Sequence, residues 1–294
     1  RCNQIHFREA IVLHRQGCLN EADALYHAML QRDPNHFDAL RLSGAIAVQK
    51  HDYSRALDYL QRALTIRPDD PEPYSNRGVA LRELKRLDDA LASYDRAIAL
   101  KPDLADAHYN RGVVLQELKC LEDALASYDR AIALKPDYAD AYNSRGNVLR
   151  QLNRVEDALS SYERAIALKP DHAEAHSNRG NLLRESERLD DALASYDRAI
   201  ALKPDIAEFY NNRGVALLGL KYLNDALASY ERAIALKPDY AEAHNNRGIV
   251  LYELKCLKDA LTSYDRAIAL KSDYAEAYYS RGNTLWELKR LDDA

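Results

Sequence analysis

The chain has 294 residues, of which 47% are hydrophobic, but only three are Phe, one is Trp and one is Met. Most of the hydrophobic residues are Ala and Leu, a composition that favours many small cores in series over one large core. The 41 Lys and Arg residues against 46 Asp and Glu residues give a net charge of −5, so the positive excess that nucleic-acid binding requires is missing. No stretch approaches the roughly 18 apolar residues of a membrane span, and the early charges of Arg1, Arg8, Glu9 and Arg15 argue against a secretion signal.

Glycine and proline recur regularly and divide the chain into repeats. Glycine returns every 34 residues, at Gly44, Gly78, Gly112, Gly146, Gly180, Gly214, Gly248 and Gly282. Proline has the same period, at Pro34, Pro68, Pro102, Pro136, Pro170, Pro204 and Pro238, and Ser272 takes the next place. A fixed period of this length is the signature of an array in which one supersecondary unit is stacked many times.

The repeats predict a single array over residues 1–294, with eight complete repeats and a partial ninth. They span residues 3–36, 37–70, 71–104, 105–138, 139–172, 173–206, 207–240, 241–274 and 275–294. A position from 1 to 34 denotes below the place of a residue within its repeat. The ninth repeat has 20 positions, so we expect the sequence to stop inside a second helix, and the Arg at residue 1 indicates a fragment.

Each repeat is predicted to form two helices, which makes the fold class all-α. At 100° per residue, the first helix of repeat 105–138 has two packing stripes, one formed by His108, Gly112 and Leu115 and one by Ala107, Arg111, Val114 and Leu118. Its remaining side, called the open face below, carries Asp106, Tyr109, Asn110, Val113, Gln116, Glu117 and Cys120. A second helix is expected from about Glu122 to Lys135, and Pro136 ends it. Asp137 is then placed to cap the next first helix, with Asp140 completing a capping box.

These positions carry a family resemblance. The chain resembles the tetratricopeptide repeat, which has an aromatic residue at position 4, small residues at positions 8, 20 and 27, large apolar or aromatic residues at 11 and 24, and Pro at 32. In repeat 139–172 these places hold Tyr142, Gly146, Ala158, Ala165, Leu149, Tyr162 and Pro170. The resemblance covers essentially the whole chain and implies a helix-turn-helix solenoid, wound into a right-handed superhelix whose first helices line a concave groove.

The runs Asn-Arg-Gly and Ala-Ile-Ala-Leu-Lys-Pro-Asp look like those of bacterial arrays. The recurring Asn at position 6 is similar to that of the array preceding the catalytic domain of protein O-GlcNAc transferases.

Position 7 departs from the family, because Arg stands there where Leu is usual. The series is Arg77, Arg111, Arg145, Arg179, Arg213, Arg247 and Arg281. Since this position lies in the stripe that faces the neighbouring repeat, the guanidinium groups need partners there. We predict a structural ladder of ion pairs with the acids of the second helices, Asp95, Asp129, Glu163, Asp197, Glu231 and Asp265. The loop acids of the Asp103 series are the alternative partners.

The cysteines and histidines do not suggest a metal or redox site. Cys18, Cys120 and Cys256 share position 16 in distant repeats, too far apart for disulfides, so we expect reduced thiols in a cytoplasmic protein. His172 and His176 frame a short run that differs by one residue from the zinc-protease pattern His-Glu-x-x-His, and no third ligand is evident. His108, His176 and His244 alternate with Tyr at position 4, so the favoured interpretation is an imidazole packed in place of an aromatic ring. No cofactor or metal is expected.

Enzymatic and RNA-binding functions are disfavoured. No nucleophile elbow, phosphate loop or dinucleotide-binding turn occurs, because the glycines recur once per repeat for helix packing. A helical RNA-binding repeat would need a basic groove, whereas position 2 is acidic from repeat three onward. The favoured explanation of these acids is interaction with the helix dipole, with a ligand role as the alternative.

The open face supplies the candidate binding residues. Asn is a poor helix former, yet it recurs there and can bond both the N–H and the C=O of an extended peptide. The middle repeats are polar and locally basic, whereas later repeats carry apolar and aromatic residues that are costly in water unless covered. The predicted peptide-binding residues are Asn110, Asn147, Arg150, Asn178, Asn181, Arg184, Asn212, Leu218, Asn246, Tyr252 and Trp286.

Some short arrays of the family bind a C-terminal carboxylate through Lys, Asn and Arg at set positions. This chain supplies Asn147 and Asn178 in register, but Asn143, Glu208 and Asn212 replace the cations, so that clamp is disfavoured. The sequence favours a non-catalytic scaffold whose groove binds an extended peptide or partner segment, with end-to-end contacts between copies as a further expectation. The alternative is the substrate-recognition arm of a larger enzyme, such as a glycosyltransferase.

Overall fold

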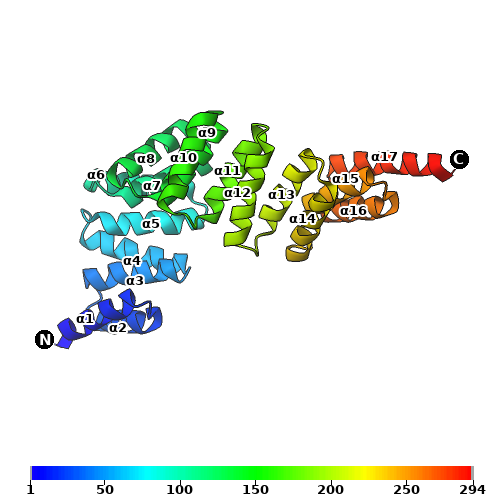
Figure 1. Ribbon diagram of the computed structural model, residues 1–294. Coiled ribbons are helices and arrows are strands. Elements are labelled where there is room, and N and C mark those ends of the chain that lie inside the picture. The colour runs from blue at the N-terminus through cyan, green and yellow to red at the C-terminus, as the bar shows by residue number, and fades with distance from the viewer. Residues whose placement is uncertain (1, 293–294) are drawn as a thin grey trace. The chain divides into compact units, whose positions relative to one another are not determined.

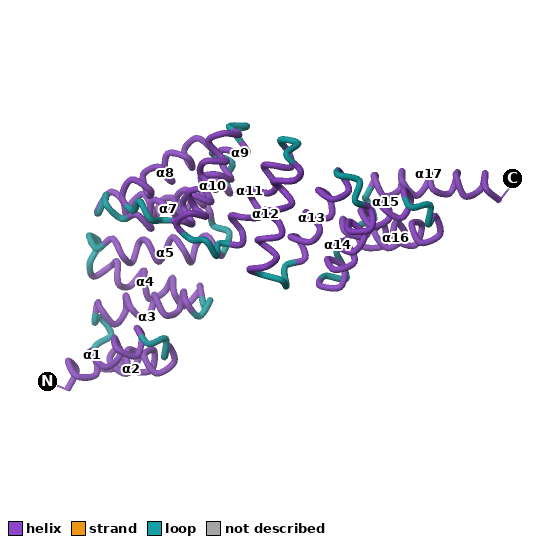
Figure 2. Tube along the Cα trace, viewed as in Figure 1, coloured by secondary structure: helices purple, strands orange, loops and turns teal. Residues whose placement is uncertain are grey.

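The computed structural model describes residues 2–292, and this part of the chain forms 17 α-helices and no strand (Figure 1). Short turns separate the helices throughout, as the tube in Figure 2 makes plain. The all-α class is therefore confirmed. The chain divides into two compact units, unit 1 (Arg1–Leu152) and unit 2 (Asn153–Ala294).

The helices alternate between first and second helices of a repeat. Unit 1 contains α1 (Cys2–Arg15), α2 (Leu19–Arg32), α3 (Phe37–Gln49), α4 (Tyr53–Ile66), α5 (Pro71–Glu83), α6 (Leu87–Leu100), α7 (Ala105–Glu117), α8 (Leu121–Leu134) and α9 (Ala139–Gln151). Unit 2 contains α10 (Val155–Leu168), α11 (Ala173–Glu185), α12 (Leu189–Leu202), α13 (Ala207–Gly219), α14 (Leu223–Leu236), α15 (Ala241–Glu253), α16 (Leu257–Leu270) and α17 (Ala275–Asp292). Within each unit, consecutive helices pack against each other and successive first helices also touch, as α5 touches α7 and α13 touches α15.

A tyrosine packed over a glycine forms the centre of most repeats. Tyr230 of α14 is fully buried, and a Cβ added to Gly214 of α13 would lie 2.6 Å from its Cε1 atom. Ala226 and Ala233 flank this tyrosine on α14 and are also fully buried. The small residues at positions 8, 20 and 27 thus let two backbones approach closely around one aromatic ring. The same pairing recurs at Gly78 with Tyr94, Gly112 with Tyr128, Gly180 with Tyr196, and Gly248 with Tyr264.

The turn inside each repeat forces one residue into the left-handed conformation. After α7, the N–H of Cys120 donates to the Leu115 carbonyl at 2.9 Å and that of Lys119 to the Gln116 carbonyl at 3.1 Å. This is a Schellman ending, in which the residue after the cap adopts a positive φ, here 64° at Lys119. The same position is Gly17 in the first repeat, and it is occupied elsewhere by His51, Lys85, Asn153, Glu187, Lys221 and Lys255.

The predicted capping of first helices by Asp137 and its equivalents is wrong. Tyr138 is the N-cap of α9 and its side chain makes no cap hydrogen bond. The Tyr138 N–H donates to the Lys135 carbonyl at 3.1 Å, so Pro136 and Asp137 occupy the middle of a tight turn, one residue too early for a cap. A side-chain cap is present where position 34 has an acceptor, as at His36, Asp70 and His172.

The expectation that a second helix begins within repeat nine is also wrong for the described residues. α17 continues without a turn through Lys289, whose position is left-handed in the other repeats, and reaches Asp292. A Cβ at Gly282 would meet nothing within 4 Å, because no second helix covers this glycine in the described chain. Without that packing partner, a continuous helix avoids the cost of a left-handed lysine. The last residues of the predicted ninth repeat, 293 and 294, lie outside the described residues.

Candidate binding surface

The arginines at position 7 form the predicted structural ladder. Arg213 Nε lies 2.6 Å from Asp197 Oδ1 of the preceding second helix, and its Nη1 donates to Ser229 Oγ of its own second helix at 2.8 Å. Ser229 in turn donates to the Asp225 carbonyl at 2.8 Å, so one guanidinium joins α12, α13 and α14. The same ion pair is present at Arg111 with Asp95, Arg145 with Asp129, Arg179 with Glu163, Arg247 with Glu231, and Arg281 with Asp265. The prediction is confirmed, and these arginines belong to the packing between repeats.

The histidines at position 4 replace tyrosine, as predicted. Nε2 of His176 donates to the Pro170 carbonyl at 3.1 Å. The hydroxyl of Tyr210 donates to the Pro204 carbonyl at the same distance, so the two side chains make one equivalent bond. His172 accepts a hydrogen bond from the Ala175 N–H and lies 3.3 Å from Glu174. Within residues 2–292, no group of three or more His, Cys, Asp or Glu side chains could hold a metal ion.

Three of the predicted binding residues lie in unit 1. Asn110 is on α7, and Asn147 and Arg150 are on α9, and all three side chains are half-buried. The open face of α7 is more closely packed than the sequence suggested, because Tyr109 stacks at 4.9 Å from Tyr138.

The polar candidates of unit 2 lie on the first helices and share contacts with the core. Asn178, Asn181 and Arg184 are on α11, and all are half-buried. Asn181 Oδ1 accepts a hydrogen bond from the hydroxyl of buried Tyr196 at 2.8 Å. Sequence reasoning missed this structural role, because position 9 of one helix reaches position 24 of the next only once the helix pair is folded.

Further along unit 2, the asparagines bond to one another across repeats. Asn212 on α13 and Asn246 on α15 are half-buried, and Asn246 Nδ2 donates to Asn211 Oδ1 at 3.1 Å. Buried Arg184 Nε has no hydrogen-bond partner within the described residues. Polar groups thus remain available on α11, while part of the amide series serves to join successive repeats.

The apolar candidates are accessible and are not core residues. Leu218 on α13 and Tyr252 on α15 are half-buried, and Trp286 on α17 is 64% exposed. A cavity of about 120 Å³ opens beside Tyr252, between α15, α16 and α17, and is lined by Ile249, Tyr252, Tyr264, Ser280 and Asn283. The structure therefore brings an aromatic side chain to the edge of a small cavity between two first helices.

A charged cluster borders this cavity. A hydrogen bond to Glu287 raises the pKa of Tyr252, and Lys255 Nζ lies 2.9 Å from the same carboxylate. Equivalent Lys to Glu pairs join positions 15 and 13 of successive repeats at Lys221 with Glu253 and at Lys85 with Glu117. The sequence analysis did not identify this second ladder, although Lys at position 15 and Glu at position 13 recur in register.

Comparison with known proteins identifies the family. The sequence profile of the tetratricopeptide repeat matches residues 7–71, 120–173, 143–205 and 177–223, and a related repeat profile matches residues 78–119, 222–255 and 250–289. The chain belongs to the tetratricopeptide repeat family. Among the residues that the structure describes, no helix is long and apolar enough to cross a membrane.

Several solved structures share this fold. YrrB, described as a tetratricopeptide repeat protein with an unusual peptide-binding site, is 28% identical, with 63% of this chain and 95% of YrrB covered and a TM-score of 0.52. Cut9 in the APC/C hetero-tetramer Cut9-Hcn1 is 17% identical, with 91% of this chain and 52% of the other covered and a TM-score of 0.70. A tetratricopeptide repeat protein from Parabacteroides merdae is 20% identical, with 85% and 98% covered and a TM-score of 0.65. The last two likenesses concern the fold alone.

The curated relatives match over a short segment. Protein O-mannosyl-transferase TMTC1 of Mus musculus is 31% identical over 90 residues, and that of Homo sapiens is 32% identical over 89 residues. Each match covers 29% of this chain and 10% of the relative, so the chain spans about a tenth of the length of these enzymes.

Proposed function

We propose that the protein is a non-catalytic scaffold that binds an extended peptide or partner segment on the open face of its first helices. Membership of the tetratricopeptide repeat family supports an interaction role. The likeness to YrrB, whose description names a peptide-binding site, supports a peptide as the ligand.

The observation that carries the proposal is the accessible surface of unit 2 around Tyr252. Tyr252 borders a cavity between α15 and α17, and Trp286 is largely exposed on the next first helix. Aromatic side chains beside a small pocket are typical anchors of an interface. The apolar side chains of the peptide would dock there, and Asn178, Asn181, Arg184, Asn212 and Asn246 would contact its backbone and acidic groups.

Binding can be tested with peptides selected from a displayed random library on the whole chain. We expect Tyr252→Ala combined with Trp286→Ala to weaken binding of the selected peptides by about 1–2 kcal/mol, as is usual for aromatic anchors. The thermal midpoint should change little, because both side chains are accessible to solvent.

The matched control is Tyr222→Ala. Tyr222 is 53% exposed and precedes α14, away from the cavity that Tyr252 lines. Its removal should leave peptide affinity unchanged. Equal affinities for wild type and the Tyr252 and Trp286 double variant would show that the binding surface lies elsewhere.

A second candidate is a substrate-recognition arm of a larger glycosyltransferase, which the segment shared with the O-mannosyl-transferases favours. The test is the full-length gene product. A glycosyltransferase domain in the same polypeptide supports the arm, whereas an uninterrupted array of repeats supports the scaffold.

The cytoplasmic location, a bacterial origin and end-to-end association of copies stay predictions. Cys18, Cys120 and Cys256 form no disulfide, which agrees with a reducing compartment. Association through α17 would cover Tyr278 and Leu285, which are 50% and 41% exposed.

A further inference from the structure

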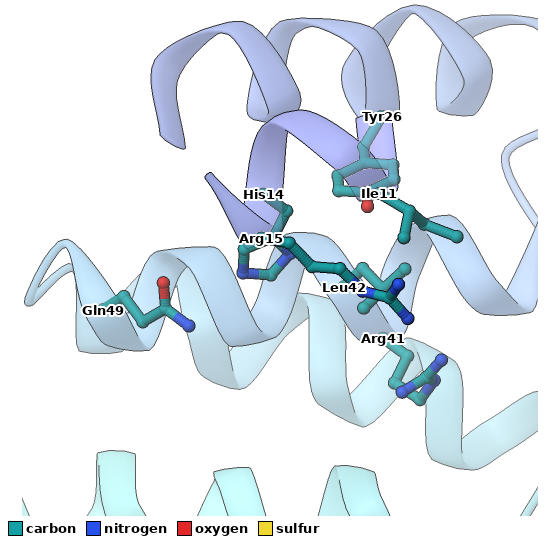
Figure 3. A pocket seen from close by; sticks show the side chains of 7 residues that line it. All are labelled: Ile11, His14, Arg15, Tyr26, Arg41, Leu42 and Gln49. Carbon is teal, nitrogen blue, oxygen red and sulfur yellow. The ribbon is translucent and has the colours of Figure 1, made fainter. Parts of the chain in front are cut away.

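The largest cavity with a defined lining lies in unit 1, far along the sequence from the residues proposed to bind peptide. It has a volume of about 450 Å³ and lies between α1, α2 and α3 (Figure 3). Its lining residues are Ile11, His14, Arg15, Tyr26, Arg41, Leu42 and Gln49. This volume is within the usual range for small-molecule sites.

The inner part of the cavity is apolar. Ile11 of α1 and Leu42 of α3 face it with the ring of Tyr26, which reaches in from α2 (Figure 3). Tyr26 is fully buried, and its hydroxyl has no hydrogen-bond partner among the described residues. A buried hydroxyl without an acceptor carries a desolvation cost that a ligand oxygen would remove.

The rim of the cavity is cationic. Arg15 is exposed and has no ion-pair partner within the described residues, whereas Arg41 pairs with Glu72 and, at 3.6 Å, with Asp38. Burial raises the pKa of Tyr26 to about 12, and the charge of Arg41 acts against this rise, so a guanidinium lies near the orphan hydroxyl. Burial also lowers the pKa of His14, so this side chain is neutral near pH 7 and the positive charge comes from the arginines.

The same place in the array is filled differently elsewhere. Position 12 is His14 here, Gln116 on α7 and Arg184 on α11. The hydroxyl of Tyr128 donates to Gln116 Oε1 at 3.1 Å, so in that repeat the side chain at position 12 supplies the acceptor that Tyr26 lacks. The first two repeats therefore combine an apolar interior, a hydrogen-bond donor without an acceptor and an unpaired cation.

We propose that this cavity binds a low-molecular-weight apolar carboxylate. Its hydrocarbon part packs against Ile11, Tyr26 and Leu42, and its carboxylate faces Arg15 and accepts the hydrogen bond of the Tyr26 hydroxyl. The site is independent of the peptide-binding function proposed for unit 2, since it shares no residue with it.

Calorimetric titration of the whole chain with 4-phenylbutanoate tests the proposal. We expect this acid to bind at least about tenfold more tightly than the neutral 4-phenylbutanol, because a hydrogen bond to a charged group contributes more than one to a hydroxyl. Acetate, which lacks the hydrocarbon part, should not bind measurably. Equal affinities of the acid and the alcohol would overturn the proposal, as would binding of acetate or tighter binding of a peptide that ends in a free Leu carboxylate.

Two variants locate the binding. Tyr26→Phe keeps the buried ring and removes the hydroxyl, and should weaken binding of the acid by about tenfold. Arg15→Gln changes an exposed side chain, so folding is preserved, and should weaken it by about threefold or more. Tyr94→Phe, which also removes an orphan hydroxyl at position 24, and Arg96→Gln, which removes an exposed charge on α6, are the matched controls. Unchanged affinity in Arg15→Gln, or an equal loss in the controls, would place the acid outside this cavity.

Discussion

At the scale of single residues, a guanidinium at position 7 replaces the usual apolar contact between repeats. The side chain of Arg213 is 29% exposed and that of its partner Asp197 is 51% exposed, so water screens their attraction. Ser229, which accepts a second bond from Arg213, is buried at 2% or 3% exposure like its equivalents. The bond to this serine is therefore the less screened half of the arrangement.

We predict that Arg213→Gln lowers the free energy of unfolding in urea by about 1–2 kcal/mol, since it removes an ion pair and a hydrogen bond together. A double-mutant cycle with Asp197→Asn should give a coupling energy of only about 0.5–1 kcal/mol, because that pair is partly exposed. Arg77→Gln is the control, since Gln61 stands where an acid would pair with Arg77, and it should cost less. Equal losses for Arg77 and Arg213 would mean that packing of the side chain, and not its pairing, stabilises the contact.

At the scale of elements, the turn between the two helices of a repeat stores backbone strain. Lys119 has a φ of 64° and is exposed, whereas the first repeat uses Gly17 at this position with a φ of 79°. A side chain in this conformation costs roughly 1 kcal/mol relative to glycine. We predict that Lys119→Gly raises the free energy of unfolding by about 0.5–1 kcal/mol, measured by urea denaturation.

The reverse change supplies the control for this turn. Gly17→Ala meets no atom within 4 Å, so any loss of stability comes from the backbone alone and should be about 1 kcal/mol. A destabilising Lys119→Gly would mean that the greater freedom of glycine in the unfolded chain outweighs the relief of strain.

The pairing of helices within a repeat depends on close approach at position 8. Gly214→Ala would place a methyl group 2.6 Å from the Tyr230 ring and should destabilise unit 2 by about 1–3 kcal/mol through overpacking. Gly282→Ala meets nothing within 4 Å and should instead stabilise α17 by up to about 1 kcal/mol, because alanine is the better helix former. Circular dichroism during thermal unfolding would compare the two variants. Opposite signs support the packing described here, and a destabilised Gly282 variant would indicate that α17 is covered in solution.

At the scale of the whole molecule, the sequence predicted what repeats within one unit of 34 residues. Periodicity placed the helices and the partners of Arg213, because those residues recur in register with the fold. The cap at Asp137 was mispredicted because a shift of one residue in the preceding turn changes which residue begins the helix. The bond from Tyr196 to Asn181 depends on how far two particular side chains reach across a helix pair. Periodicity does not specify such reach, so the predicted binding surface turned out more closely tied to the core than expected.

The three histidines at position 4 give the array a dependence on pH. Burial lowers the pKa of His108, His176 and His244 below 6.5, although the bond of each to a proline carbonyl opposes this shift. The unfolded chain therefore takes up protons near pH 6.5 that the folded chain takes up only at lower pH, and stability falls as the pH decreases through this window.

We predict that the free energy of unfolding of the wild type is smaller at pH 5.5 than at pH 7.5, and that His108→Tyr, His176→Tyr and His244→Tyr together reduce this difference. Tyrosine is the fitting replacement, because Tyr74 and Tyr210 donate to a proline carbonyl at the same position. Some dependence should persist, since burial also lowers the pKa of His14. Urea denaturation of both proteins at the two pH values measures the effect. An unchanged difference in the triple variant would assign the pH dependence to groups other than these three imidazoles.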